Sequence, residues 1–310
     1  MRSAFLWPLA AALAILPCRA HAVHRDPPSK AEAQAIHRVE KLSDHAYVIF
    51  GQGGNVGLFV TDKHAILVDD QFEQLAPGLL KAIASVTTLP IKYLVNTHAH
   101  PDHVGANVVL EHQVTAILAH TNVRKRMVAA QLALDPAKRG GLPELAFGEE
   151  NAAIRARMDI HLDGAEFHLL HMGPGHTDGD LILGYPAELV MHMGDLFFHG
   201  SLPYIDQDGG GSFDGLVAQI DSVAGWLPDG AKIIPGHGPV ATKKDLVRYR
   251  DLLKAVQAHA KAHPELTPAA LAAGFDPAAW PDYKPMAGFV TWETLFAAAS
   301  GKGAGRVTKP

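Results

Sequence analysis

The chain has 310 residues, of which 48% are hydrophobic and 19% are charged, and its formal net charge is −5. This composition is too apolar for a disordered chain and too mixed for a fibrous or polytopic membrane protein, and the lack of a basic surplus argues against a nucleic-acid partner. Nineteen histidines stand beside a single cysteine. Because histidine is the commonest metal ligand, the positions of these residues decide what their number indicates.

Residues 1–22 have the features of a secretory signal peptide. Arg2 provides the positive start, residues 4–16 form an apolar stretch too short to span a bilayer comfortably, and residues 20–22 fit an A-x-A cleavage site. We expect a secreted or periplasmic mature protein without stable membrane insertion, with an uncleaved membrane anchor as the alternative. Cleavage would also remove Cys18, and with it disulfides, thiolate ligands and cysteine nucleophiles.

Three further regions are expected along the mature chain. Residues 23–43 are polar and contain proline, which indicates an N-terminal arm, residues 44–300 form the main folded domain, and residues 301–310 form a flexible tail. In the first half of the domain, apolar alternation and helical spacing predict strands at 47–50, 58–60, 65–68, 91–95 and 114–118, and helices at 74–86 and 122–134.

The second half of the domain begins with a segment rich in proline, glycine and charge at 135–160, which we expect to form a loop or lid. The patterns that follow predict a pair of strands within 160–170, strands at 181–183, 189–192 and 232–234, and helices at 216–227, 242–263 and 292–299. Strands and helices interleave with few clear βαβ units. This order favours α/β layers with mixed sheets.

The strongest chemical signal is the motif H-x-H-x-D-H, which directly follows the strand at 91–95. In an extended segment residues two apart point the same way, so His98 and His100 can bind one ion. The proline after His100 favours a helix start, which places Asp102 and His103 on a first helical turn facing the same cleft. Four ligand-type residues in six positions can supply two adjacent metal half-sites.

Two close ions need more ligands than this motif supplies, because zinc takes histidine nitrogen and carboxylate oxygen and a catalytic site also keeps a position for water. Three candidates follow other predicted strands beside glycine: His176 in G-P-G-H-T, Asp195 in M-G-D and His237 in P-G-H-G-P. Glycine allows close backbone approach. Each candidate alone also fits a capped turn or a buried polar residue, but together with the first motif they predict a metal centre.

This set of motifs resembles the metallo-β-lactamase-fold hydrolases over residues 47–263. The resemblance implies a four-layer αβ/βα sandwich with two mixed β-sheets and a dimetal site along one edge. It also implies two Zn²⁺ ions per chain, with iron or manganese as alternatives. By this resemblance the first metal would be held by His98, His100 and His176, the second by Asp102, His103 and His237, and Asp195 would bridge both.

The predicted ligands indicate which branches of this family the chain resembles most. β-Lactamases with a cysteine ligand are excluded, because the mature chain has no cysteine. Those with only histidines and one aspartate match six positions but usually lack the bridging carboxylate of Asp195, which is more similar to glyoxalase II-like thioesterases, lactonases and related hydrolases. Flavodiiron members carry an acid in place of His100 and are disfavoured. The acidic balance disfavours nucleic-acid-processing members.

We therefore predict a hydrolase in which a metal-bridging hydroxide opens the carbonyl of a small ester, lactone, thioester or β-lactam substrate. Asp102 would bind metal and also orient the hydroxide or relay its proton. In the segment after Asp195, Tyr204 or His199 would donate a hydrogen bond to the developing oxyanion. An ordinary polar surface loop, which also contains Asp206, is the alternative for this segment.

The sequence also leaves other functions open, as well as which segments surround the metal centre. The alternatives are a mononuclear-iron redox enzyme similar to persulfide dioxygenases and a non-catalytic periplasmic metal-binding protein. Asn55 and Phe59 lie near a hairpin that would cover the site, and residues 135–160 would form another wall. The remaining histidines, including His112, are interpreted as structural or surface residues. Substrate and oligomeric state are left open.

Overall fold

The computed structural model describes residues 37–151, 155–286 and 288–302. The signal peptide predicted at 1–22 lies outside the described residues, as do most of the arm at 23–43 and of the tail at 301–310. These three assignments therefore stay predictions.

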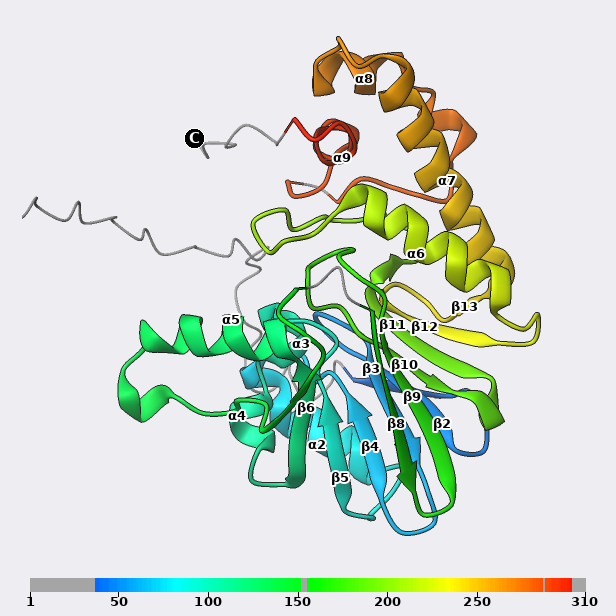
Figure 1. The fold of residues 1–310 in the computed structure, drawn as a ribbon. Helices are drawn as coiled ribbons and strands as arrows, with labels where there is room; N and C mark the ends of the chain where they lie inside the picture. The colour runs from blue at the N-terminus through cyan, green and yellow to red at the C-terminus, as the bar shows by residue number, and fades with distance from the viewer. Residues whose placement is uncertain (1–36, 152–154, 287, 303–310) are drawn as a thin grey trace, which may run out of the picture.

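The strands form two sheets that stack face to face (Figure 1). The seven-stranded sheet has the order β1 (Arg38–Lys41), β2 (Ala46–Phe50), β3 (Val56–Val60), β4 (Ala65–Val68), β5 (Ile91–Val95), β6 (Val114–His120) and β7 (Leu145–Phe147). The six-stranded sheet has the order β13 (Ala241–Thr242), β12 (Lys232–His237), β11 (Val190–Phe198), β10 (Ile182–Tyr185), β9 (Ala165–His171) and β8 (Ala156–Leu162).

Both sheets are mixed. In the first sheet β1 to β4 pair antiparallel and β4 to β7 pair parallel. In the second sheet β8 to β11 pair antiparallel, β11 and β12 pair parallel, and β13 pairs antiparallel with β12. The predicted mixed sheets are confirmed.

Strand β4 shows how one sheet contributes side chains to two hydrophobic cores, one between the sheets and one beneath the outer helices. Successive side chains of a strand point to opposite faces. Ile66 and Val68 accordingly pack between the two sheets, whereas Ala65 and Leu67 pack against the helices on the outer face. All four side chains are fully buried. A strand covered on both faces is a continuous apolar run, which is why the sequence predicted its bounds correctly.

Helices cover the outer face of each sheet (Figure 1). The first sheet carries α2 (Ala76–Ala84), α3 (Pro101–Val104), α4 (Asn107–Leu110) and α5 (Thr121–Leu132). On the side of the second sheet lie α6 (Phe213–Trp226), α7 (Lys243–Ala262), α8 (Pro268–Gly274) and α9 (Trp292–Ala299). The four-layer αβ/βα sandwich is therefore confirmed. Within the described ranges, no helix has both the length and the apolarity needed to cross a bilayer.

Short polar elements account for the differences from the predicted order. β1 lies inside the predicted arm, and β7 lies inside the predicted loop at 135–160, where it extends the first sheet beside β6. Both are edge strands with exposed or half-buried side chains, so neither carries an apolar pattern. The short elements β13 and α8 were also not predicted.

The long helix α7 offers a test of the sequence-level capping argument. Thr242 accepts a hydrogen bond from the backbone N–H of Asp245, and the Asp245 carboxylate accepts from the backbone N–H of Thr242. Replacing Thr242→Ala is expected to lower the free energy of unfolding by about 1 kcal/mol, because the helix loses its cap. Urea denaturation measures the change. The exposed neighbour Lys244→Ala is the control, with an expected effect within about 0.5 kcal/mol, and equal midpoints for the two variants would contradict the capping role.

Candidate metal centre

The predicted ligands come from both sheets and meet at one edge of the sandwich. From the first sheet, the loop after β5 carries His98 and His100, and α3 carries Asp102 and His103. From the second sheet come His176 between β9 and β10, Asp195 within β11, and His237 at the end of β12. The structure brings all seven side chains together in two neighbouring groups.

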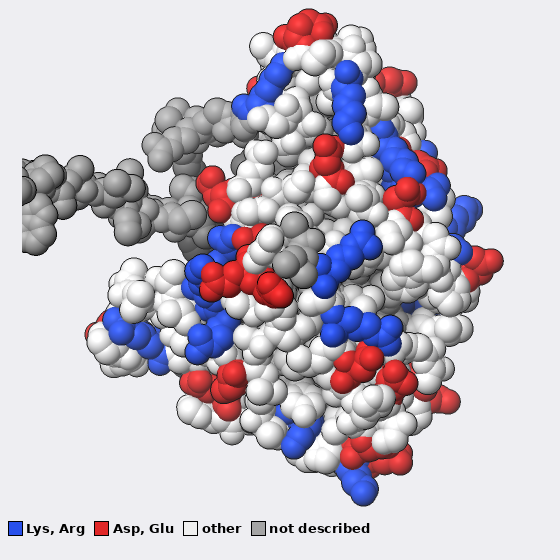
Figure 2. Space-filling view, viewed as in Figure 1, with Lys and Arg blue, Asp and Glu red and all other residues white. Residues whose placement is uncertain are grey.

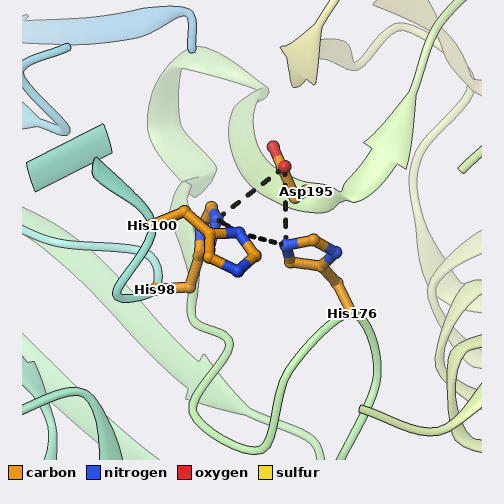
Figure 3. Close-up of side chains that lie close together, drawn as sticks. All are labelled: His98, His100, His176 and Asp195. Atoms are coloured by element: carbon orange, nitrogen blue, oxygen red, sulfur yellow. Dashed lines mark hydrogen bonds and ion pairs between the residues drawn. The ribbon is translucent and has the colours of Figure 1, made fainter. Parts of the chain in front are cut away.

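The first group consists of His98, His100, His176 and Asp195 (Figure 3). His100 Nδ1 lies 3.0 Å from His98 Nε2 and 2.9 Å from His176 Nε2. Asp195 Oδ2 lies 3.7 Å from His98 Nε2 and 3.5 Å from His176 Nε2. Three imidazole nitrogens and one carboxylate oxygen therefore converge.

The second group consists of Asp102, His103 and His237. His103 Nε2 and His237 Nε2 are 3.4 Å apart. Asp102 Oδ2 lies 3.4 Å from His237 Nε2 and 3.7 Å from His103 Nε2. The helix start predicted after His100 is present, with Pro101 in the first turn of α3, and it places Asp102 and His103 in this group.

Asp195 lies between the two groups. Its Oδ2 faces the first group, whereas its Oδ1 lies 3.1 Å from His103 Nε2 and 3.4 Å from His237 Nε2. The carboxylate therefore presents one oxygen to each group. The sequence placed Asp195 after a strand that ends at 192, but β11 continues to Phe198. The pairing of β11 with β12 shifts register at Gly194, which has a φ of 50°, and such a bulge re-aims the following side chain.

The donor set fits metal ions. In the first group the nitrogens of three histidines face one another at hydrogen-bond distance, and neutral imidazoles cannot all donate in such an arrangement. A cation among them satisfies every lone pair at once. Ligands about 2.1 Å from a tetrahedral zinc lie roughly 3.4 Å from one another, which is close to the separations in both groups.

The outer ring nitrogen of four of the histidines is also held. The partner atoms are Thr97 Oγ1 for His98 (3.0 Å), Asp206 Oδ2 for His100 (2.9 Å), Asp69 Oδ2 for His103 (2.7 Å) and the Tyr204 carbonyl for His176 (2.8 Å). Such contacts fix the tautomer and the orientation of a metal-binding imidazole. The fifth histidine, His237, stacks on the ring of Phe198 with centroids 5.3 Å apart.

Asp69 is a site residue that the sequence reasoning missed. It is fully buried directly after β4, and it accepts hydrogen bonds from the backbone N–H and the hydroxyl of Thr97 as well as contacting His103. The available signal was its position, because a polar residue directly after an apolar strand is the same context that selected the predicted ligands.

The electrostatics of the first group suit cation binding. Burial opposes ionisation of Asp195, but the surrounding imidazoles hold its pKa well below the usual range. His237 contributes most to this lowering, followed by His103. Burial lowers the pKa of His98 far below its usual value and lowers the pKa of His176 to about 4. Near neutral pH, His98 and His176 thus present neutral imidazoles beside an ionised carboxylate, which are the protonation states that metal ligands require.

Two glycines allow the backbone to pack against the second group. A Cβ at Gly54 would overlap the ring of His103, and a Cβ at Gly236 would overlap the carboxylate of Asp195. Only glycine fits at such close approaches. The glycine-rich segment after β2 and the glycine before His237 therefore serve close packing around the ligands.

The two predicted substrate contacts lie in different places. The ring of Tyr204 lies beside the first group, with its centroid 6.1 Å from that of His100 and 5.8 Å from that of His176. His199 instead directs Nδ1 to the carbonyl of Pro239 (3.0 Å) and Nε2 toward Asp245 (4.0 Å). Hydrogen-bond donation to an oxyanion stays a prediction, which the placement favours for Tyr204 over His199.

The predicted hairpin cover is not a loose flap. The amide of Asn55 is buried and donates to the carbonyls of Pro235 and Gly238, on either side of His237. Phe59 lies on the same hairpin but packs between the two sheets and is fully buried, so its side chain is part of the core. The apolar alternation that made Phe59 part of a strand also turned its ring into the core.

The fold and the two side-chain groups together define a protein of the metallo-hydrolase class. The model of the metallo-beta-lactamase superfamily matches residues 49–237, more than half of the chain. The chain belongs to this superfamily, as the resemblance had implied.

Relatives and solved structures agree with this assignment. The chain is 31% identical over 182 residues to the hydroxyacylglutathione hydrolase GloC of Haemophilus influenzae. The aligned region covers 58% of this chain and 83% of the relative. The chain is 23% identical over 199 residues to the metallo-beta-lactamase type 2 of Bacillus cereus, covering 63% and 70%. Among solved structures, the sec-alkylsulfatase Pisa1 from Pseudomonas sp. has a TM-score of 0.66 at 15% identity, covering 88% of this chain and 51% of that one. A metallo-beta-lactamase from Pontibacter korlensis has a TM-score of 0.57 at 19% identity, covering 70% and 99%.

The position of Asp195 between the groups leads to a direct test. Asp195→Ala is expected to reduce zinc content and any zinc-dependent activity by orders of magnitude, because both groups lose a charged ligand. Zinc per chain after dialysis, measured by elemental analysis, checks this, and Asp195→Asn provides the variant closest in shape. The strongly exposed His112→Ala is the control and is expected to match the unaltered protein. Normal zinc content in both Asp195 variants would refute the bridging role.

Proposed function

We propose that the protein is a secreted dizinc hydrolase that opens an ester, lactone, thioester or β-lactam carbonyl. The single observation that carries this proposal is the carboxylate of Asp195, which presents one oxygen to each of two adjacent groups of metal-ligand side chains. A storage site needs no such pair of neighbouring positions. Two zinc ions held there would acidify water and polarise a carbonyl, which is the chemistry a hydrolase requires.

The residues of the chain have distinct parts in this proposal. His98, His100 and His176 would hold one zinc ion, and Asp102, His103 and His237 would hold the other. Asp102 is also partly exposed, with 22% of its side chain accessible. This access allows its carboxylate to exchange a proton with bound substrate or solvent. Tyr204 would border the substrate beside the first group.

Thioesters and lactones are the preferred substrates within the proposed class. The ligand set with a bridging carboxylate is similar to glyoxalase II-like hydrolases, and the 31% identity to a hydroxyacylglutathione hydrolase points the same way. Because of the 23% identity to a type 2 metallo-beta-lactamase, β-lactams remain candidate substrates. Basic and acidic side chains are interspersed on the face shown in Figure 2, so this face does not favour a polyanionic partner such as a nucleic acid.

A hydrolysis panel on the zinc-loaded mature protein tests the proposal. A β-lactam, an acyl-homoserine lactone and a glutathione thioester are offered side by side, with the Asp195→Asn variant as the matched control. We expect turnover of at least one substrate, loss of this turnover after chelation, and recovery on adding Zn²⁺. Elemental analysis is expected to give about two zinc per chain.

Each alternative function gives a different result. One iron per chain without zinc would support a redox enzyme and would sink the hydrolase proposal. Tight uptake of two zinc ions with no turnover of any substrate in a broader panel of esters and amides would instead support a metal-binding protein.

Secretion is tested separately. Expression of the full chain in a Gram-negative host is expected to yield periplasmic protein whose N-terminal residue is Val23, because the A-x-A site at 20–22 ends the apolar stretch. Mass spectrometry of the fractionated cells measures this. Full-length protein retained in the cytoplasmic fraction would contradict the signal peptide.

A further inference from the structure

The segment between β11 and α6 contacts two ligands of the first metal group. The Tyr204 carbonyl accepts a hydrogen bond from His176 Nδ1 over 2.8 Å, and the Asp206 carboxylate contacts His100 Nε2 over 2.9 Å. The backbone N–H of Asp206 donates to the carbonyl of His176 over 2.9 Å. Residues 204–211, which we term the clamp loop, thus hold His100 and His176 from the side opposite the proposed metal.

Asp206 is itself held in place. Its Oδ2 faces His100, while its Oδ1 accepts from the backbone N–H of Gly209 over 2.8 Å. Its backbone carbonyl accepts from the N–H of Gly211 over 2.7 Å. A Cβ at Gly209 would overlap the carboxylate of Asp206, and a Cβ at Gly211 would overlap the carbonyl of His176. The glycine run 209–211 therefore lets the clamp loop close around this carboxylate.

The start of the clamp loop and the residues just before it are held by residues far along the chain. Leu202 N–H donates to the carbonyl of Lys284 over 3.0 Å, and Lys284 N–H donates to the carbonyl of Gly200 over 3.2 Å. The ring of Phe289 packs on that of Tyr204 with centroids 4.6 Å apart. Lys284 and Phe289 both lie beyond residue 237, where the match to the superfamily model ends. A C-terminal segment outside that match thus supports the first metal group.

The second metal group has a different support. The outer nitrogen of His103 contacts Asp69 after β4, and His237 stacks on Phe198 within β11. The contacts that hold the imidazoles of these two residues therefore come from outside the clamp loop. A change in the loop acts on one group and leaves the ligand contacts of the other in place.

We propose that Asp206 is a positioning residue that fixes the imidazole of His100 and thereby sets the metal affinity of the first group selectively, with Lys284 and Phe289 holding the start of the clamp loop and the residues before it in place. This inference rests on the dizinc centre proposed above. A carboxylate on the outer nitrogen of a metal-binding histidine fixes the ring and raises the basicity of its ligating nitrogen, and removing it typically costs 10- to 100-fold in metal affinity.

Zinc binding to metal-free protein tests this inference without any substrate. Titration against a chromophoric chelator is expected to give two zinc equivalents in the unaltered protein. In Asp206→Ala, one equivalent should bind about 10- to 100-fold more weakly, while the other changes by a much smaller factor, set by its linkage through Asp195. Asp206→Asn keeps an acceptor for His100 and should bind this equivalent more tightly than the alanine variant. Cobalt titration adds a spectroscopic signature, since the absorption bands of only one cobalt equivalent should change.

The exposed residue two positions along the same loop provides the matched control. Asp208→Ala also removes one carboxylate from the loop, but its side chain is exposed and, in the part of the chain that the structure describes, no hydrogen bond or ion pair joins it to a ligand, so its isotherm should match that of the unaltered protein. Phe289→Ala, which removes the packing of Phe289 on Tyr204, should weaken the same zinc equivalent as Asp206→Ala, by a smaller factor. Two unaltered equivalents in Asp206→Ala would overturn the proposal, and so would an equal loss of both equivalents together with a lower melting temperature of the metal-free protein. Because this readout is binding, it is independent of whether any substrate in the hydrolysis panel is turned over.

Discussion

The structure depends on one constraint: imidazole nitrogens from separate segments must lie about 3 Å apart with their lone pairs turned toward one another. Such an arrangement is unfavourable in a dry protein interior unless each ring is held from outside. His98, His100, His103 and His176 are each held by an acceptor on the outer nitrogen. The acceptors come from the ends of strands and from the loop after β11, so the centre needs both sheets in place before its ligands can meet.

The same segments also join the sheets at this edge. The N–H of Leu181, before β10, donates to the carbonyl of Thr97, after β5, over 2.9 Å, and the N–H of Asn55 donates to the carbonyl of Gly236 over 2.8 Å. His192, in β11, contacts the carbonyl of Asn55 over 3.0 Å. The buried backbone groups near the ligands thus find their partners across the sandwich. Packing between the sheets and the placement of the ligands therefore depend on the same backbone contacts.

Features of the fold and of the site that are local in sequence or strongly patterned could be predicted from the sequence. The H-x-H-x-D-H motif is contiguous, and β4 and β5 are apolar runs, so the first-sheet half of the site and its scaffold could be predicted. The contacts of Asp69 and Asp206 could not be assigned in advance. The position of Asp69 directly after an apolar strand was a signal for a site residue, but which ring nitrogen each aspartate contacts depends on three-dimensional placement. The same reason separates Tyr204 from His199, since both lie in one polar segment but turn toward different neighbours. The edge strands β1 and β7 escaped prediction because their exposed side chains leave no periodicity.

If the two groups each load one cation, as proposed, the carboxylate of Asp195 has a thermodynamic consequence. A group shared by two positions makes their occupancies linked equilibria, and linkage is reciprocal: whatever free energy the first cation contributes to the second, the second contributes to the first. Orienting the carboxylate favours joint loading, whereas repulsion between the cations opposes it. The balance of these two effects decides whether a scarce metal supply produces half-filled molecules or a mixture of empty and fully loaded ones.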